Sequence, residues 1–496
     1  MYESHYTPLR SERRRMKKIN SLTGMVLVLG WALVAAGQEK CVVKPPERPR
    51  VRVNATSAEG AEQLKYYAEG VKKMKTRPAT DPTSWTYQAA MHGTYTTPAK
   101  PLWNSCQHGS YFFLAWHRMY LYFFESIVRS ASNPEFNLPY WDYDNPTGPT
   151  DPRLQLPAPF RNTANPLYVA DRHPSMNAGG FLPEGDVQTD HSMSRMSFTC
   201  GATNFASSFG GKQVPAPVHF TTGFGALESL PHNAVHDDVG GWMSDPNTAA
   251  QDPIFWLHHS NIDRLWDAWE KLDSGRKNNW DATWLDQKFY FFNEAGKQCY
   301  LTGKDVIDDA KQLGYRYDNE KVPVPPKPVN CPVRRSTAGG ILLEHRPPNR
   351  ITLGTAPVSI DVPLKETAER GPASAQPRPL VLTLDDIQFD KNPSVGYEIF
   401  LNLPQGQEAN HKSDYYVGTI HFFGLKHSRE EGHEAQLQFD VTSIVDSLEK
   451  QGKWKGQVKI TFVPRGPREA NAPSTAAEAH VAGIATIGRV AITESQ

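Results

Sequence analysis

The chain has 496 residues, with 53 basic and 53 acidic side chains, so its formal net charge is zero. It has neither the basic surface that nucleic-acid binding requires nor an acidic tail. The length allows two or more domains, and the 40 prolines favour loop-rich connections over a single helical bundle.

Residues 1–37 are typical of an export signal. A basic head at 13–18 precedes an apolar run at 22–36, and small residues at 35–37 offer a cleavage site. The consecutive arginines also suggest a twin-arginine signal, which exports folded, metal-loaded proteins. The alternative is a membrane anchor, although spanning a bilayer takes ~20 apolar residues. We expect a periplasmic or secreted protein with no stable membrane contact after the leader is cleaved.

Five cysteines are present: Cys41, Cys106, Cys200, Cys299 and Cys331. If Cys106 has another role, the remaining four allow three different pairings. An oxidising compartment favours at least one disulfide, and the sequence leaves the pairing open.

Five helices are predicted in the first half of the chain, over 56–75, 82–91, 112–129, 230–239 and 253–274. Thr56 and Glu59 form a capping-box pair at the start of the first helix. Asp-Pro pairs at 81–82 and 252–253 each place a capping residue before a helix-starting proline. Gly275 marks the end of the last helix. The Pro-, Gly-, Asn- and Ser-rich stretch 145–218 is predicted to form long surface loops.

Six histidines fall on or beside these helices in two groups of three. The first group is His92, His108 and His117, and the second is His232, His236 and His259. Side chains at i and i+4 leave one face of a helix, so His232 and His236 can meet at one ion. An isolated pair of this kind is more often solvated or packed, but burial of several imidazoles among Phe, Trp and Leu is costly without a partner. Neutral imidazole binds copper, zinc, iron and nickel, so we predict two metal sites in a four-helix bundle.

Beyond a proline-rich linker at 321–340 the hydrophobic pattern changes to period two. The linker begins with KVPVPPKPVNCP, which is stiff. Seven short strands follow, at 351–362, 380–389, 397–403, 415–423, 435–441, 457–463 and 480–493. They predict an all-β sandwich over 341–496, behind a mainly helical domain over 50–320.

Two tracts resemble the copper motifs of the type-3 copper family of tyrosinases, catechol oxidases and haemocyanins. They are HGSYFFLAWHRMYLYFFE at 108–125 and DPIFWLHHSNID at 252–263. The likeness covers roughly 50–317, and the tract YVGTIHFFG resembles the C-terminal domain of plant and fungal polyphenol oxidases. It implies two copper ions held by the six histidines, which oxidise phenols or catechols to o-quinones with O2. It also implies that His259 is a ligand and that the adjacent His258 is a packed or supporting residue.

The resemblance implies roles for further residues near the histidines. Cys106 matches an element in which a cysteine sulfur is covalently joined to the first-site histidine, here His108; the alternative is an unmodified buried cysteine. Glu228 and Asn233 match positions that hold a water which deprotonates an incoming phenol, although Glu228 also suits a helix start. The small residues at 248–250 leave room for a bulky phenol. We therefore predict monophenol hydroxylation as well as diphenol oxidation.

Further expectations concern the residues that support the histidine sites and the domain that covers them. Arg118 and Asp263 stand in otherwise apolar helices and should pair or hold backbone groups. The rings of the Tyr-Arg-Tyr segment at 315–317 should pack on Arg50 or Arg52. The C-terminal sandwich, by family likeness, should cover the copper site and keep the enzyme latent until proteolysis at the linker; the alternative is a domain that only stabilises or assists folding.

Three other functions share parts of this pattern. A haemocyanin-like oxygen carrier would use the same ligands without substrate access, and an o-aminophenol oxidase would share every ligand. A zinc or iron dimetal protein generally recruits carboxylates, and none stands at a ligand position here. Glu228, Asn233 and the small residues at 248–250 favour the phenol-oxidising enzyme, with small phenols and O2 as its partners and no nucleic acid.

Overall fold

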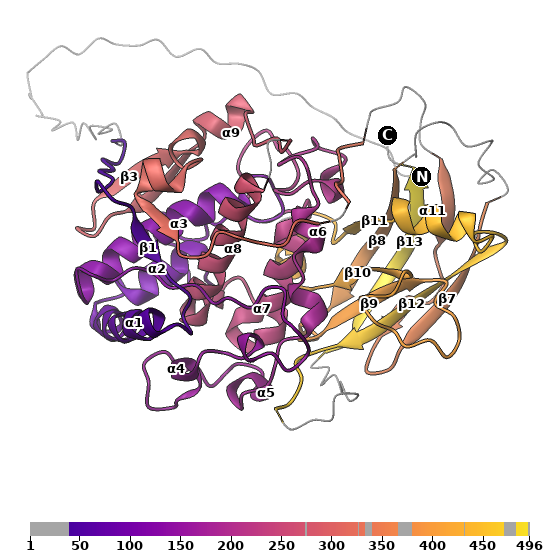
Figure 1. The fold of residues 1–496 in the computed structure, drawn as a ribbon, viewed down its shortest axis with the longest axis horizontal. Coiled ribbons are helices and arrows are strands. Elements are labelled where there is room, and N and C mark those ends of the chain that lie inside the picture. Colours follow the sequence, from indigo (N-terminus) through magenta and orange to yellow (C-terminus); the bar gives the residue numbers. More distant parts are fainter. Residues whose placement is uncertain are drawn as a thin grey trace, which may run out of the picture. The chain divides into compact units, whose positions relative to one another are not determined.

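Helices dominate the chain as far as residue 286 (Figure 1). Three long helices, α1 (Ala58–Thr76), α3 (Phe113–Ala131) and α8 (Ile254–Lys271), are supplemented by α2 (Trp85–His92) and α7 (Ala234–Val239). Both α1 and α8 pack on α3. Most of the surface of α3 is buried because its apolar and aromatic residues surround the helix axis. The helical core is therefore built around α3, as the prediction of a bundle requires.

The stretch 145–218, predicted as surface loops, is largely ordered against this core. It contains α4 (Ala158–Arg161), α5 (Pro174–Asn177), α6 (Asp190–Met193) and the 3-10 turns η1 (Pro152–Leu154), η2 (Glu184–Val187) and η3 (Phe205–Ser207). Phe160, Phe198 and Phe209 within it are fully buried. Loop composition does not produce exposure here, because apolar side chains between the prolines are buried and anchor the turns.

Several helix limits differ from the predicted ones. Ser57, rather than Thr56, caps α1 by accepting a hydrogen bond from a backbone N–H. Ser84 caps α2 in the same way, while Asp81 accepts from Thr83 in the preceding turn. Helix α8 ends at Lys271, before the glycine that was expected to stop it. Several residues near each end could act as caps, and local sequence does not decide between them.

The predicted helix over 230–239 is two elements. A π-helical turn, η4 (Glu228–Asn233), precedes α7, and Leu230 within it has non-helical angles, φ −141° and ψ 126°. Pro231 has no N–H to donate, so a continuous helix cannot pass through it. His232 consequently belongs to the turn, whereas His236 belongs to α7.

Two antiparallel sheets form the C-terminal part, coloured orange to yellow in Figure 1. Their strands are β5 (Ile341–His345), β6 (Ile351–Leu353), β7 (Val358–Pro363), β8 (Leu380–Phe389), β9 (Gly396–Leu401), β10 (Tyr416–Ile420), β11 (Leu437–Asp440), β12 (Gln457–Arg465) and β13 (Ala485–Glu494). One sheet has the order β10-β9-β12-β7, and the other has β11-β8-β13-β5 with β6 also paired to β13. The all-β class is confirmed. The prediction missed β5, merged β6 with β7, and missed the helices α10 (Leu425–Glu430) and α11 (Thr442–Lys450).

Short elements close the helical part and join it to the sandwich. Strand β1 (Arg50–Arg52) pairs in parallel with β4 (Tyr315–Tyr317), and β2 (Lys288–Phe292) pairs with β3 (Gln298–Thr302). The remaining helical pieces are α9 (Ala282–Asp286), η5 (Gly241–Ser244), η6 (Ala249–Gln251), η7 (Gly303–Asp305) and the π turn η8 (Asp309–Leu313). Two disulfides, Cys41–Cys299 and Cys200–Cys331, resolve the pairing that the sequence left open.

A buried charge network joins β1, α3 and α8. The Asp263 carboxylate accepts from Arg118 Nε at 2.5 Å, from Arg52 Nη1 at 3.2 Å, and from the hydroxyls of Tyr315 and Tyr317 at 2.6 Å each. The Arg52 guanidinium lies 3.6 Å from the centroid of the Tyr315 ring. Burial disfavours the charged carboxylate, but Arg118 and Arg52 outweigh it and lower the pKa of Asp263. The predicted pairing of Arg118 and the packing of the tyrosines on an N-terminal arginine are confirmed.

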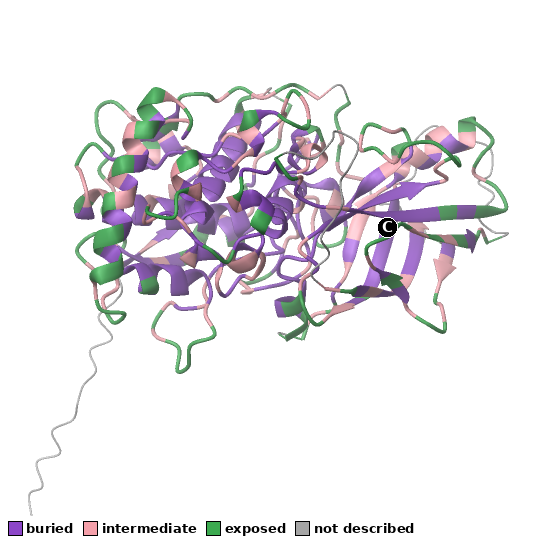
Figure 2. Cartoon of the chain, turned by 90° about the horizontal axis from the view of Figure 1, so that it is seen from below, coloured by how far each residue is buried: buried purple, intermediate pink, exposed green. Residues whose placement is uncertain are grey.

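The structure is a computed structural model. It describes residues 39–272, 275–325, 327–332, 340–365, 379–430, 432–470 and 483–494. The predicted leader at 1–37 lies outside the described residues. Within the described ranges, no helix has both the length and the apolar character to cross a membrane. Figure 2 shows the buried residues gathered in the helices and along the strands, with exposed residues mainly at turns and helix surfaces.

Candidate metal centre

All six predicted histidines are buried and form two groups at the centre of the helical part. His92 ends α2, His108 precedes α3 and His117 lies within it, whereas the second group comes from η4, α7 and α8. Within each group the candidate ligand atoms all lie within 4.8 Å of one another. The groups face each other, because the ring centroids of His117 and His259 are 4.5 Å apart and those of His108 and His232 are 5.6 Å apart.

Hydrogen bonds orient the imidazole rings. Nδ1 of three rings lies 2.7–2.8 Å from a main-chain carbonyl oxygen, in the pairs His92–Pro246, His117–Phe113 and His236–Met243. A neutral ring that donates through Nδ1 keeps a lone pair on Nε2. Among the described groups, buried Nε2 atoms without a hydrogen-bond partner occur at His92, His108, His117 and His232, and also at His258. Buried acceptors without a donor are costly, and a shared cation would satisfy them.

The second group brings two ring nitrogens to one point. Nε2 of His236, whose Nδ1 lies at the Met243 carbonyl, is 3.3 Å from Nε2 of His259, so the two nitrogens can share a proton or, once it is lost, bind one cation. Burial keeps the rings neutral, because desolvation lowers the pKa of His92 and of His232 to about 3. The same cause holds the pKa of His236 well below its ordinary value. The imidazoles therefore suit a metal ion at neutral pH, and the donor set fits copper.

His258 lies closer to this centre than we expected. One of its nitrogens belongs to the group within 4.8 Å, and its ring stacks on that of His232 at 5.3 Å and 26°. Its Nδ1 is 2.8 Å from the hydroxyl of Tyr143, while its buried Nε2 has no hydrogen-bond partner among the described groups. The hydrogen bond with the Tyr143 hydroxyl fixes this ring beside the second group.

Cys106 is buried beside the first group and takes part in neither disulfide. Its Sγ lies 3.3 Å from Nδ1 of His108. The sulfur thus contacts the edge of the imidazole to which the sequence motif predicts a covalent link.

Glu228 and Asn233 lie at the two ends of η4. Oε1 of Glu228 accepts from the backbone N–H of Gly109 at 2.9 Å, while its buried Oε2 has no partner among the described groups. Burial raises the pKa of Glu228 well above its ordinary value, and the Gly109 hydrogen bond opposes the shift only in part. Asn233 Oδ1 lies 2.8 Å from Nδ1 of His232. One carboxylate therefore joins the loop after His108 to the turn that carries His232.

Phe113 and Phe255, from the two aromatic tracts, touch the imidazoles. Phe220 and Phe423 also touch them, and the sequence pattern did not predict these two contacts. Phe220 lies flat on His108, with ring centroids 4.5 Å apart and an interplanar angle of 3°. Phe423 of the β-sandwich stacks on His236 at 3.9 Å and lies 5.7 Å from His108. The YVGTIHFFG tract was the available signal for Phe423, but it gave no position for the ring.

These features define a centre for two metal ions, with two facing imidazole sites in a helical domain. The common central domain of tyrosinase matches residues 82–272, and the polyphenol oxidase middle domain matches 279–328. A domain family of unknown function matches 349–494. Tyrosinase HcTyr1 of Hahella sp. (strain CCB-MM4) is 30% identical over 464 residues, which cover 82% of this chain and 94% of the relative. Chloroplastic polyphenol oxidase of Malus domestica is 27% identical, with 85% and 76% covered.

The solved structure of latent apple tyrosinase has the same fold, with a TM-score of 0.61 at 22% identity, covering 92% of this chain and all of that one. The chain belongs to the tyrosinase and polyphenol oxidase family. It is a copper-dependent enzyme that uses O2 to oxidise phenols and catechols to o-quinones at a centre of two copper ions. No finding favours the oxygen-carrier alternative.

Proposed function

We propose that the enzyme is a tyrosinase, which hydroxylates monophenols in addition to oxidising diphenols. His92, His108 and His117 would hold one copper ion, and His232, His236 and His259 the other. This assignment rests on the unpartnered, buried Nε2 atoms of His92, His108, His117 and His232 and on the 3.3 Å approach of the Nε2 atoms of His236 and His259. The copper pair supplies O2 binding and electron transfer, and the protein supplies the orientation of the rings and the handling of the phenol proton.

Glu228 is the group that we propose as the base for the phenol. Its free oxygen is buried and its proton affinity is raised, so it can accept a proton, directly or through a water held with Asn233. An o-diphenol needs no hydroxylation, and its oxidation depends less on this base. Substitution of Glu228 should therefore affect monophenol hydroxylation more than diphenol oxidation.

Glu228→Gln should lower kcat for a monophenol by about 10²-fold, the usual contribution of a general base, and leave catechol oxidation largely intact. Glutamine retains a carbonyl oxygen to accept from Gly109, so the turn should keep its structure. Initial rates with a monophenol, primed with a trace of diphenol, measure the effect. Equal losses on both substrates would contradict the role, and a wild-type enzyme with no monophenol turnover beyond the primer would exclude hydroxylation.

A covalent thioether between Cys106 and His108 is the second proposal. The 3.3 Å contact from Sγ to Nδ1 places the sulfur beside a ring carbon. Forming the S–C bond releases two hydrogen atoms, for which O2, the oxidant of the enzyme, would be the acceptor. Copper-loaded protein, denatured and measured by intact mass, should be lighter than the apoprotein by two hydrogens, and Cys106→Ser should remove the difference. Equal masses would leave an unmodified buried cysteine.

Latency is the third proposal, with Phe423 as the residue that blocks the copper site. The ring is fully buried and contacts imidazoles of both groups. Gly424, with φ +78°, ends the turn; a side chain there would meet the Phe220 ring at 2.9 Å. Only glycine suits this conformation and close approach, so the turn is shaped to deliver Phe423. The fold-related apple enzyme is itself described as latent.

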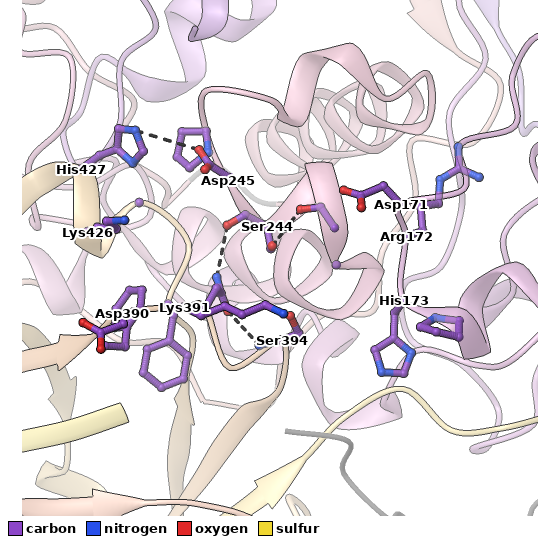
Figure 3. A pocket seen from close by; sticks show the side chains of 18 of the residues that line it. Asp171, Arg172, His173, Ser244, Asp245, Asp390, Lys391, Ser394, Lys426 and His427 are labelled. Carbon is purple, nitrogen blue, oxygen red and sulfur yellow. Dashed lines mark hydrogen bonds and ion pairs between the residues drawn. The ribbon is translucent and has the colours of Figure 1, made fainter. Parts of the chain in front are cut away.

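Polar contacts from the helical part hold this turn in place. Asp237, next to His236, accepts the backbone N–H groups of Phe422 at 2.5 Å and Phe423 at 3.2 Å. Asn392 Nδ2 donates to the same carboxylate at 2.8 Å. A cleft of about 700 Å³ runs along this seam, with Ser244, Asp245, Lys391 and His427 around it (Figure 3). These contacts support a sandwich docked on the helical part.

Phe423→Ala should raise catechol oxidation by about tenfold to hundredfold, because burial of one Phe side chain contributes roughly 1.5–3 kcal/mol to docking. Initial rates of the intact variant measure this, with the domain present on a denaturing gel. Phe389→Ala is the matched control, since that ring packs on Phe422 at 5.3 Å within the sandwich. Equal gains in both variants would indicate general loosening, and no gain in either would leave a stabilising domain.

We also propose domain limits of 50–320, 321–340 and 341–496, and export through the leader at 1–37. The change from helices to antiparallel strands beyond residue 340 supports the limits. The two disulfides support an oxidising compartment. N-terminal sequencing of the exported protein would locate the cleavage, and retention in the membrane fraction would favour the anchor.

A further inference from the structure

The linker ahead of the β-sandwich is fastened to the helical part at residues 329–331. Val329 pairs with the segment beside it, donating its N–H to Ser194 O at 2.8 Å and accepting from Met196 N at 2.9 Å. Two residues later, Cys331 forms a disulfide with Cys200. Residues 321–325 and 327–328, by contrast, are mostly exposed, with Val324 at 68%. Exposed residues of the described linker therefore precede its point of attachment.

The segment that receives the linker is itself firmly placed. Trp269 of α8 donates its indole N–H to Arg195 O at 2.7 Å, which ties the segment to the helix that carries His259. Asp440 of β11 accepts from Ser207 Oγ at 3.2 Å, and its carboxylate lies 3.5 Å from the Arg195 guanidinium. The disulfide thus joins the linker to a surface that the β-sandwich already contacts.

We propose that the Cys200–Cys331 disulfide is a tether that decides which proteolytic cuts can release the β-sandwich. A cut at 321–328 leaves Cys331 on the C-terminal fragment, so the fragment stays covalently attached to Cys200. Only a cut after Cys331 frees it. This inference rests on the proposed latency, because release matters only if the docked domain blocks the copper site.

Tethering controls activity through effective concentration. A short covalent connection holds two partners at roughly millimolar effective concentration, far above the concentration of an enzyme in an assay. Phe423 in a protein cut at 321–328 would therefore return to the site however far the sample is diluted. The same cut without the disulfide would let the fragments separate, and the active fraction would rise on dilution.

The test uses the full copper-loaded chain with one recognition sequence for a specific protease. In one variant it is inserted between Pro323 and Val324, and in another between Ser336 and Thr337. A third variant combines the first insertion with Cys200→Ser and Cys331→Ser. Each is cut to completion, examined on denaturing gels with and without reductant, and assayed on a catechol before and after a large dilution.

The first variant should run as one species without reductant, separate with reductant, and stay latent at every dilution. The second and third should separate without reductant and gain about tenfold or more in activity on dilution, the range expected for loss of Phe423. Separation of the first variant without reductant would show that the disulfide does not connect the fragments. A covalent first variant with full activity after cutting would also overturn the proposal. If no variant changes activity while the gels behave as expected, the latency fails and the tether stands.

Discussion

His259→Ala should bind one copper ion per chain instead of two and lose catechol oxidation by at least about 10³-fold. The magnitude follows because a catalytic metal lowers the activation barrier by several kcal/mol, and each 1.36 kcal/mol changes the rate tenfold. Nε2 of His259 faces Nε2 of His236 at 3.3 Å. The alanine variant would therefore leave the second ion with two imidazole ligands, one in α7 and one in η4. Elemental analysis of dialysed protein gives the copper content independently of activity.

His258→Gln is the matched control for this experiment. The residue is the adjacent imidazole on the same helix, is equally buried, and has its Nδ1 bound to Tyr143. If the ligand set is the one proposed, this variant keeps both copper ions. Loss of copper from His258→Gln with retention in His259→Ala would reverse the assignment of the two neighbours.

Asp263→Ala should destabilise the folded protein by about 3–5 kcal/mol, the usual effect of removing one partner from a buried ion pair. The substitution leaves the guanidinium groups of Arg52 and Arg118 buried without their shared carboxylate, and deprives the hydroxyls of Tyr315 and Tyr317 of their acceptor. Chemical denaturation at neutral pH, followed by tryptophan fluorescence of the copper-free protein, measures the loss.

Asp286→Ala provides the comparison for a surface pair. Its carboxylate binds Lys304 at 2.8 Å, but both side chains are more than half exposed. Such pairs contribute about 0–1 kcal/mol, so this variant should unfold close to the wild type. A similar loss in both variants would mean that the buried network around Asp263 stabilises the protein no more than a surface ion pair does.

Local sequence was sufficient to predict the histidines of the centre that lie on helices or beside them. The burial of His117 among aromatic residues and the i, i+4 spacing of His232 and His236 predicted two groups of imidazoles, which the structure brings together. The same reasoning placed His92 at the end of a helix, and His108 in the loop before the next one. The pairing of Arg118 with Asp263 followed because an arginine and an aspartate in apolar helices require partners.

Local sequence failed where the outcome depends on contacts between distant residues. Pro231 signals an interruption, but local sequence does not predict the hydrogen bond that the same turn makes through Glu228 to Gly109, which lies far away in the chain. Phe220 and Phe423 reach the imidazoles from a loop and from another domain, and no periodicity marks them. The disulfide partner of Cys331 was undecidable for the same reason.

The parallel pairing of β1 with β4 has a consequence for engineering this enzyme. It places residue 50, near the beginning of the described chain, beside Tyr315, where the helical part ends. Neighbouring ends are the geometry that circular permutation tolerates. A short peptide joining them, with new termini opened at an exposed loop tip, would yield a dicopper unit in which the sandwich could be attached elsewhere or left out.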